Sequence, residues 1–147
     1  MKRQGYLLVM VALALTLFGL LLLPYSLLSR LNAERTLRSQ SSLQALYLAE
    51  AGAWEAIARL DSKNGAPGSP LLVCRTAIAP CTSTSPDYVG CYTYSSSQPT
   101  DCTTPTLPSG TTVTFWGFGK TKDGLVRWVK VTYDTANQAM LSWEVLP

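Results

Sequence analysis

Four cysteines are the residues of this chain whose types and spacing point most directly to chemistry. Cys74, Cys81, Cys91 and Cys102 lie in a stretch rich in serine, threonine and proline. An even number of cysteines in such a stretch predicts two disulfide bonds formed in an oxidising compartment. Sequence proximity favours pairing Cys74 with Cys81 and Cys91 with Cys102, although four cysteines allow other pairings.

A zinc site is the alternative use of these cysteines. Structural zinc sites present their ligands in close pairs such as C-x-x-C, often together with histidine. Here six residues separate Cys74 from Cys81, ten separate Cys91 from Cys102, and the chain has no histidine. The spacing therefore favours disulfides, and we expect neither a metal nor another cofactor.

The remaining polar residues offer no catalytic arrangement. The sequence contains no G-x-S-x-G motif, no glycine-rich phosphate loop and no clustered pair of carboxylates. Without histidine, Ser–His and Cys–His nucleophile pairs and histidine-containing metal sites are excluded. We expect a protein that is not an enzyme.

Residues 6–23 form a run that carries no charge and is almost entirely apolar. A helix rises about 1.5 Å per residue, so a helix continued to residue 28 could cross the roughly 30 Å hydrocarbon core of a bilayer. The run is apolar on every side, which a buried helix in so short a chain does not require. We expect a transmembrane helix over residues 6–28 and an amphipathic continuation of that helix over residues 29–60.

The orientation in the membrane follows from the cysteines. Basic residues flank the apolar run on both sides, so the distribution of positive charge does not decide the orientation. The predicted disulfides place the C-terminal part outside the cytoplasm. We expect a single-pass membrane protein with an extracytoplasmic, disulfide-stapled β domain over residues 61–147.

Strand patterns dominate the sequence after the helix, where glycine and proline at residues 61–70 break the helical period. Residues 71–75 and 88–94 are short strand candidates. Residues 111–118, 125–133 and 139–146 are rich in β-branched and aromatic side chains and predict an antiparallel meander. We expect an α+β fold in which this sheet covers an apolar helical stripe. The stripe is formed by Leu46, Ala49, Ala53, Ala56 or Ile57, and Leu60.

The N-terminus resembles the signal of type IV pilins and pseudopilins. Residues 1–5 form a short basic leader that ends in Gly5, and the apolar run begins at once with Tyr6. The resemblance implies that a prepilin peptidase removes residues 1–5, that Tyr6 becomes the methylated N-terminus, and that the apolar helix is retained. An uncleaved signal anchor is the alternative.

A second resemblance lies at residues 45–53, A-L-Y-L-A-E-A-G-A. This alanine-rich stretch is similar to the corresponding region of PilX-type minor pilins and of the tip pseudopilin of type II secretion. The resemblance implies a pilin-like fold, other pilins as partners through the N-terminal helix, residence in the inner membrane before assembly, and a cell-surface or periplasmic filament.

The chain departs from that family at two positions. The family usually begins its mature chain with Phe and carries Glu as the fifth mature residue, where this chain has Tyr6 and Met10. The tip pseudopilin also lacks this Glu, so the departure at Met10 predicts a subunit at or near the filament tip. A subunit inserted along the shaft, where the missing ion pair is tolerated, is the alternative. Such subunits serve pilus biogenesis, adhesion, twitching motility or DNA uptake.

Other interpretations use the soluble part of the chain. Residues 61–147 carry equal numbers of basic and acidic side chains, which gives no bulk attraction for nucleic acid. The aromatic residues in 115–119 could bind a surface ligand, although alternating aromatics in a strand more often form core. Four cations near one predicted hairpin could touch DNA phosphates: Lys120, Lys122, Arg127 and Lys130. A pseudopilin of a type II secretion system and a membrane-anchored extracytoplasmic binding module remain alternatives.

Overall fold

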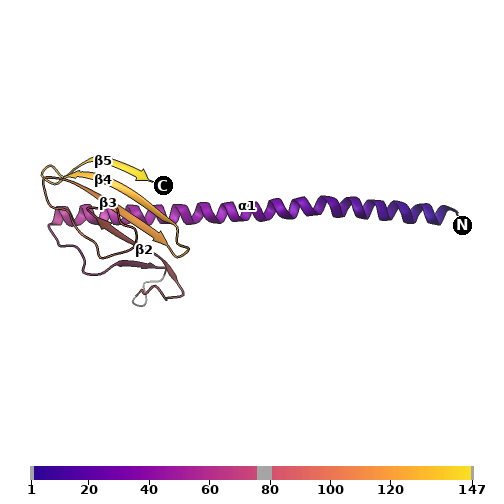
Figure 1. The fold of residues 1–147 in the computed structure, drawn as a ribbon, viewed down its shortest axis with the longest axis horizontal. Helices are drawn as coiled ribbons and strands as arrows, with labels where there is room; N and C mark the ends of the chain where they lie inside the picture. Colours follow the sequence, from indigo (N-terminus) through magenta and orange to yellow (C-terminus); the bar gives the residue numbers. More distant parts are fainter. Residues whose placement is uncertain (1, 76–80, 147) are drawn as a thin grey trace. The chain divides into compact units, whose positions relative to one another are not determined.

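The computed structural model describes residues 2–75 and 81–146, and it leaves the side chains of residues 2–8, 21–23 and 26 undescribed. In this part of the chain a single helix precedes five strands (Figure 1). The elements are α1 (Lys2–Ser62), β1 (Leu71–Cys74), β2 (Tyr88–Ser95), β3 (Thr112–Thr121), β4 (Val126–Asp134) and β5 (Ala139–Leu146). The chain divides into two compact units, Met1–Ser39 and Gln40–Pro147.

The predicted α+β class is confirmed. The sheet has the order β1-β2-β3-β4-β5, and each strand pairs antiparallel with the next. The three strands of the predicted meander correspond to β3, β4 and β5, and the two short candidates correspond to β1 and β2. The meander therefore extends through all five strands.

Small residues allow α1 and β3 to approach each other closely. Ala45, Ala49 and Ala53 on the helix are completely buried. A methyl group added at Gly117 would meet the Ala49 carbonyl oxygen and the Ala53 backbone nitrogen, and one added at Gly119 would meet the Ala45 carbonyl oxygen. We call these five residues the small-residue seam. It gives the alanine-rich stretch of the helix a packing role.

The main core surrounds this seam on the helix side of the sheet. Tyr94, Phe115, Val129 and Val131 are completely buried there, since alternate residues of each strand point toward α1. Leu46 and Leu60 pack partly buried against the same cluster. The predicted apolar stripe of the helix is thus confirmed as the sheet-facing side.

The compact C-terminal unit includes the second part of α1. Near its start, the Arg127 Nη2 atom donates a hydrogen bond of 2.8 Å to Ser42 Oγ. Ser41 Oγ donates one of 3.2 Å to Asp123 Oδ2 in the turn between β3 and β4. These contacts explain why the unit begins at Gln40. The domain boundary predicted at residue 61 is a different one, because it lies where glycine and proline end the helical pattern of the sequence.

The part of the chain that the structure describes contains no helix with the length and apolar character needed to cross a membrane. The transmembrane helix expected over residues 6–28 is therefore not found there. The side chains at residues 6–8, 21–23 and 26 of that segment lie outside the description.

Replacing Gly119 with alanine should destabilise the C-terminal unit. The new methyl group would press on the main chain of α1 at Ala45 and Ala49, and overpacking of this kind typically costs about 1 to 3 kcal/mol. Chemical denaturation of the full-length protein in detergent, followed by tryptophan fluorescence, measures the change. Gly68→Ala is the matched control, because nothing lies within 4 Å of its added methyl group. Equal stability of the two variants would contradict the seam.

Candidate binding site on the outer face of the sheet

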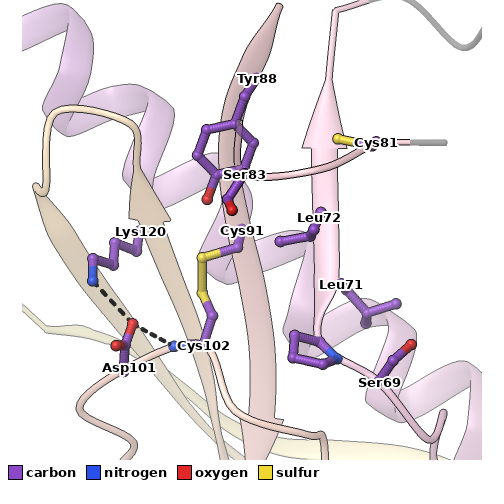
Figure 2. Close-up of a pocket in the computed structure, with 11 residues that line it drawn as sticks. Ser69, Leu71, Leu72, Cys81, Ser83, Tyr88, Cys91, Asp101, Cys102 and Lys120 are labelled. Carbon is purple, nitrogen blue, oxygen red and sulfur yellow. Dashed lines mark hydrogen bonds and ion pairs between the residues drawn. A yellow bond between two sulfur atoms is a disulfide. The ribbon is translucent and has the colours of Figure 1, made fainter. Parts of the chain in front are cut away.

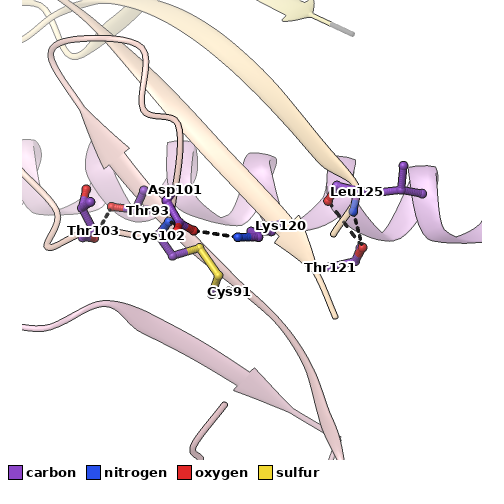
Figure 3. The surroundings of a disulfide bond; sticks show 8 residues. All are labelled: Cys91, Thr93, Asp101, Cys102, Thr103, Lys120, Thr121 and Leu125. Atoms are coloured by element: carbon purple, nitrogen blue, oxygen red, sulfur yellow. Dashed lines mark hydrogen bonds and ion pairs between the residues drawn. A yellow bond between two sulfur atoms is a disulfide. The ribbon is translucent and has the colours of Figure 1, made fainter. Parts of the chain in front are cut away.

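The outer face of the sheet, which points away from α1, is partly covered by the segment at residues 96–111, which connects β2 and β3. We call this segment the crossing loop. Thr93 Oγ1 on β2 donates a 2.8 Å hydrogen bond to the Thr103 carbonyl oxygen (Figure 3). Trp128 Nε1 on β4 donates one of 2.8 Å to the Pro99 carbonyl oxygen. The loop is therefore attached to strands on both sides of β3.

Two disulfide bonds fix the loops on this face. Cys91 of β2 is bonded to Cys102 of the crossing loop, with 6.2 Å between their Cα atoms. Cys74 at the end of β1 is bonded to Cys81, with a Cα–Cα distance of 5.7 Å. This pairing is the one that sequence proximity favours. The described residues contain no cluster of cysteine and carboxylate ligands that could hold a metal ion.

A pocket of about 580 Å³ lies between these loops and the first three strands (Figure 2). Its floor is a row across the sheet, because Leu72 pairs with Cys91 and Cys91 pairs with Lys120. Ser83, two residues after Cys81, lies on one wall, and Asp101, next to Cys102, lies on another. Each disulfide therefore holds one wall of the pocket in place.

An ion pair marks the part of the pocket near the crossing loop. Lys120 Nζ lies 2.9 Å from Asp101 Oδ1, which also accepts a 2.8 Å hydrogen bond from the Cys102 backbone N–H. These two bonds lower the pKa of Asp101, with the Lys120 bond as the larger cause. The carboxylate therefore remains charged at neutral pH, and the pair is lost only as the pH falls through that lowered pKa.

Three hydroxyl groups in the pocket have unused hydrogen-bonding capacity. The side chains of Ser69, Ser83 and Tyr88 line the pocket, and none makes a hydrogen bond within the described part of the chain. Burial raises the pKa of Tyr88, so its phenol is a neutral donor and acceptor at physiological pH. The pocket thus combines the apolar side chain of Leu72 and a disulfide with several polar atoms that have no partner within the described residues.

The aromatic residues of β3 divide between the two faces of the sheet. Phe115 and Phe118 are completely buried, as expected for core residues. Trp116 is only partly buried on the outer face, where the Lys130 ammonium lies 5.5 Å from its ring centroid. Trp116 is therefore the aromatic residue of this stretch that remains partly exposed.

The four predicted cations do not form one basic surface. Lys120 pairs with Asp101 at the pocket, whereas Arg127 binds Ser42 on the helix side. Lys130 lies over Trp116 on the outer face, and Lys122 is exposed near the turn after β3. The sequence placed these residues on one hairpin, but alternate strand positions send them to opposite faces.

The predicted processing site, between Gly5 and Tyr6, lies near the N-terminal end of α1. Both residues belong to α1, and the Tyr6 side chain lies outside the description. Met10 is described and is 51% exposed on α1.

Sequence reasoning did not anticipate the pocket. Its residues come from β1, β2, β3 and two loops, so no local spacing reveals it. The glycines at alternate positions 117 and 119 were a signal for close packing against the helix, because they place two missing side chains on one face of a strand.

Comparison with known proteins adds no relative. No family model matches the chain, and no curated protein or solved structure is similar enough to count as a match.

Replacing both Cys91 and Cys102 with alanine should release the crossing loop. The bond closes a loop with a sequence separation of 11, and loops of this length contribute roughly 2 to 3 kcal/mol in the chain-entropy model. We expect a lower denaturation midpoint and new protease cleavage within residues 96–111.

The matched control replaces Cys74 and Cys81 with alanine. That disulfide spans a separation of 7 but leaves the crossing loop attached, so cleavage within residues 96–111 should not increase. Similar cleavage of the crossing loop in both variants would contradict the assigned role of Cys91–Cys102. Peptide mapping of the parent protein without reduction should find all four cysteines blocked to alkylation.

Proposed function

We propose that this protein is a minor, non-catalytic subunit of a type IV pilus-like filament. The apolar segment at residues 6–28 would hold it in the inner membrane before assembly and then pack among the helices of other pilins. The C-terminal unit would lie outside the cytoplasm, where its two disulfides are stable.

Exposed apolar side chains on the first part of α1 carry this proposal. The large apolar side chains that the structure describes between Val9 and Leu31 are more than half exposed. Val9, for example, is 58% exposed, and Leu31 is 51% exposed. Large apolar side chains exposed along so much of a helix require lipid or other protein around them. Membrane residence followed by helix packing in a filament would supply each environment in turn.

The second unit also supports the proposal. A helix packed through small residues on an antiparallel meander is the architecture that the pilin resemblance implies. The alanine-rich stretch that suggested the resemblance forms the helix side of the small-residue seam. A pseudopilin of a type II secretion system would share all of these features.

A membrane-anchored binding module is the second candidate. The pocket on the outer face favours it, because a ligand site needs no filament to function. In this case residues 1–5 would remain on the protein and α1 would serve only as an anchor.

Processing after Gly5 separates the two candidates. Intact-mass analysis of protein purified from its native membranes should give a chain that begins at Tyr6, with the added mass of one methyl group. Gly5→Val should block the cleavage, whereas Gly19→Val, at an open position on α1, should leave it unchanged. A parent mass that includes residues 1–5 would exclude the filament proposal and favour the anchored module.

Met10 predicts where the subunit lies in the filament. A carboxylate in an apolar environment is costly unless it has a partner, and the resemblance implies that the family's Glu pairs with the N-terminus of the subunit ahead. A tip subunit has no subunit ahead, so we expect that Met10→Glu does not increase incorporation into filaments. Gold-labelled antibodies against the C-terminal unit should mark filament ends.

Even labelling along filaments, or better incorporation of the Met10→Glu variant, would contradict the tip position. Met10→Gln is the matched control, because it is polar but cannot form the ion pair.

A further inference from the structure

We infer that the pocket between the two disulfide-held loops binds a neutral saccharide. This inference does not depend on the filament proposal, because every residue that it uses belongs to the C-terminal unit. The pocket volume of about 580 Å³ lies within the range of about 300 to 1,000 Å³ that is common for small-ligand sites.

The free polar atoms match the chemistry of sugar hydroxyls. A sugar hydroxyl both donates and accepts hydrogen bonds, and the hydroxyls of Ser69, Ser83 and Tyr88 do the same. Lys120 uses one of its three N–H donors on Asp101, and Asp101 Oδ2 accepts no hydrogen bond within the described residues. Adjacent hydroxyls on a sugar ring could therefore accept from Lys120 and donate to Asp101 together.

The pocket also offers an apolar surface for the C–H face of a sugar ring. Leu72 of β1 lies beside Cys91, with which it pairs across the sheet (Figure 2), and Pro70, just before β1, also lines the pocket. The Tyr88 ring lies on the side of Ser83. Apolar contacts of this kind position a ring while the polar groups around it fix its orientation.

Charge favours neutral over acidic sugars. The Lys120 ammonium is the only cation that lines the pocket in the described part of the chain, and Asp101 already neutralises it. A carboxylated or phosphorylated sugar would bring a second anion close to Asp101. Repulsion from Asp101 would therefore offset its attraction to Lys120.

The two disulfides make the site rigid before a ligand arrives. Cys81 and Cys102 tie the walls that carry Ser83 and Asp101 to the sheet. Because less conformational freedom is lost on binding, a few hydrogen bonds are sufficient for measurable affinity.

The test uses full-length protein in lipid nanodiscs, because alkyl glycoside detergents carry sugars that would compete. A panel of neutral and acidic monosaccharides to trisaccharides is screened by saturation-transfer NMR. Calorimetry then measures the affinity of the best ligand. We expect at least one neutral saccharide to bind, and its acidic derivatives to bind more weakly.

Single substitutions then locate the site. Asp101→Asn and Lys120→Met should each lower the affinity roughly tenfold, as expected for the loss of hydrogen bonds to charged groups. Tyr88→Phe and Ser83→Ala should lower it several-fold. Glu144→Gln on β5 and Ser96→Ala in the crossing loop are matched controls outside the pocket and should have no effect.

Three results would overturn the inference. The first is the absence of any saccharide that binds more tightly than about 10 mM. The second is binding that the four pocket substitutions leave unchanged. The third is a preference for acidic over neutral sugars.

The variants should fold normally, since the Lys120–Asp101 pair is largely exposed and such pairs add little stability.

Discussion

The close approach of the α1 and β3 main chains is the contact on which the rest of the C-terminal unit depends. Because the small-residue seam brings backbone atoms together, large side chains must pack beside the helix. Tyr92 on one side donates a 2.7 Å hydrogen bond to Glu55, and Trp143 on another contacts Trp54 with 5.3 Å between ring centroids. The seam therefore sets how closely the helix approaches the sheet, and the flanking aromatic residues set where the helix lies across the strands.

Alanine and glycine bury little apolar area, so the seam fixes geometry more than it supplies hydrophobic free energy. Additional apolar surface is buried on the opposite face of the sheet. Phe118 points outward and is completely buried, with its ring centroid 5.8 Å from that of Trp128. Trp128 in turn binds the crossing loop through Pro99. The loop thus covers a second apolar layer, and the Cys91–Cys102 bond keeps this cover closed.

The sequence predicts the elements of this fold better than their contacts. The strands of β3, β4 and β5 follow from β-branched and aromatic residues, and the disulfide pairing follows from proximity along the chain. The position of Arg127 against Ser42 does not follow, because it depends on the register between β3 and β4. The pocket likewise depends on the alignment of Leu72, Cys91 and Lys120 across three strands. Local patterns carry no information on such alignments until the strands are paired.

The two faces of the sheet separate two kinds of interaction within the C-terminal unit. α1 covers the inner face, and its opposite side exposes Leu43 and Tyr47. The pocket lies on the outer face, beyond the sheet from the helix. A subunit that packs against its neighbours through α1 would therefore leave the pocket free. Because the seam fixes the inner face and the disulfides fix the outer one, substitutions in the crossing loop can alter the pocket without disturbing the exposed surface of α1.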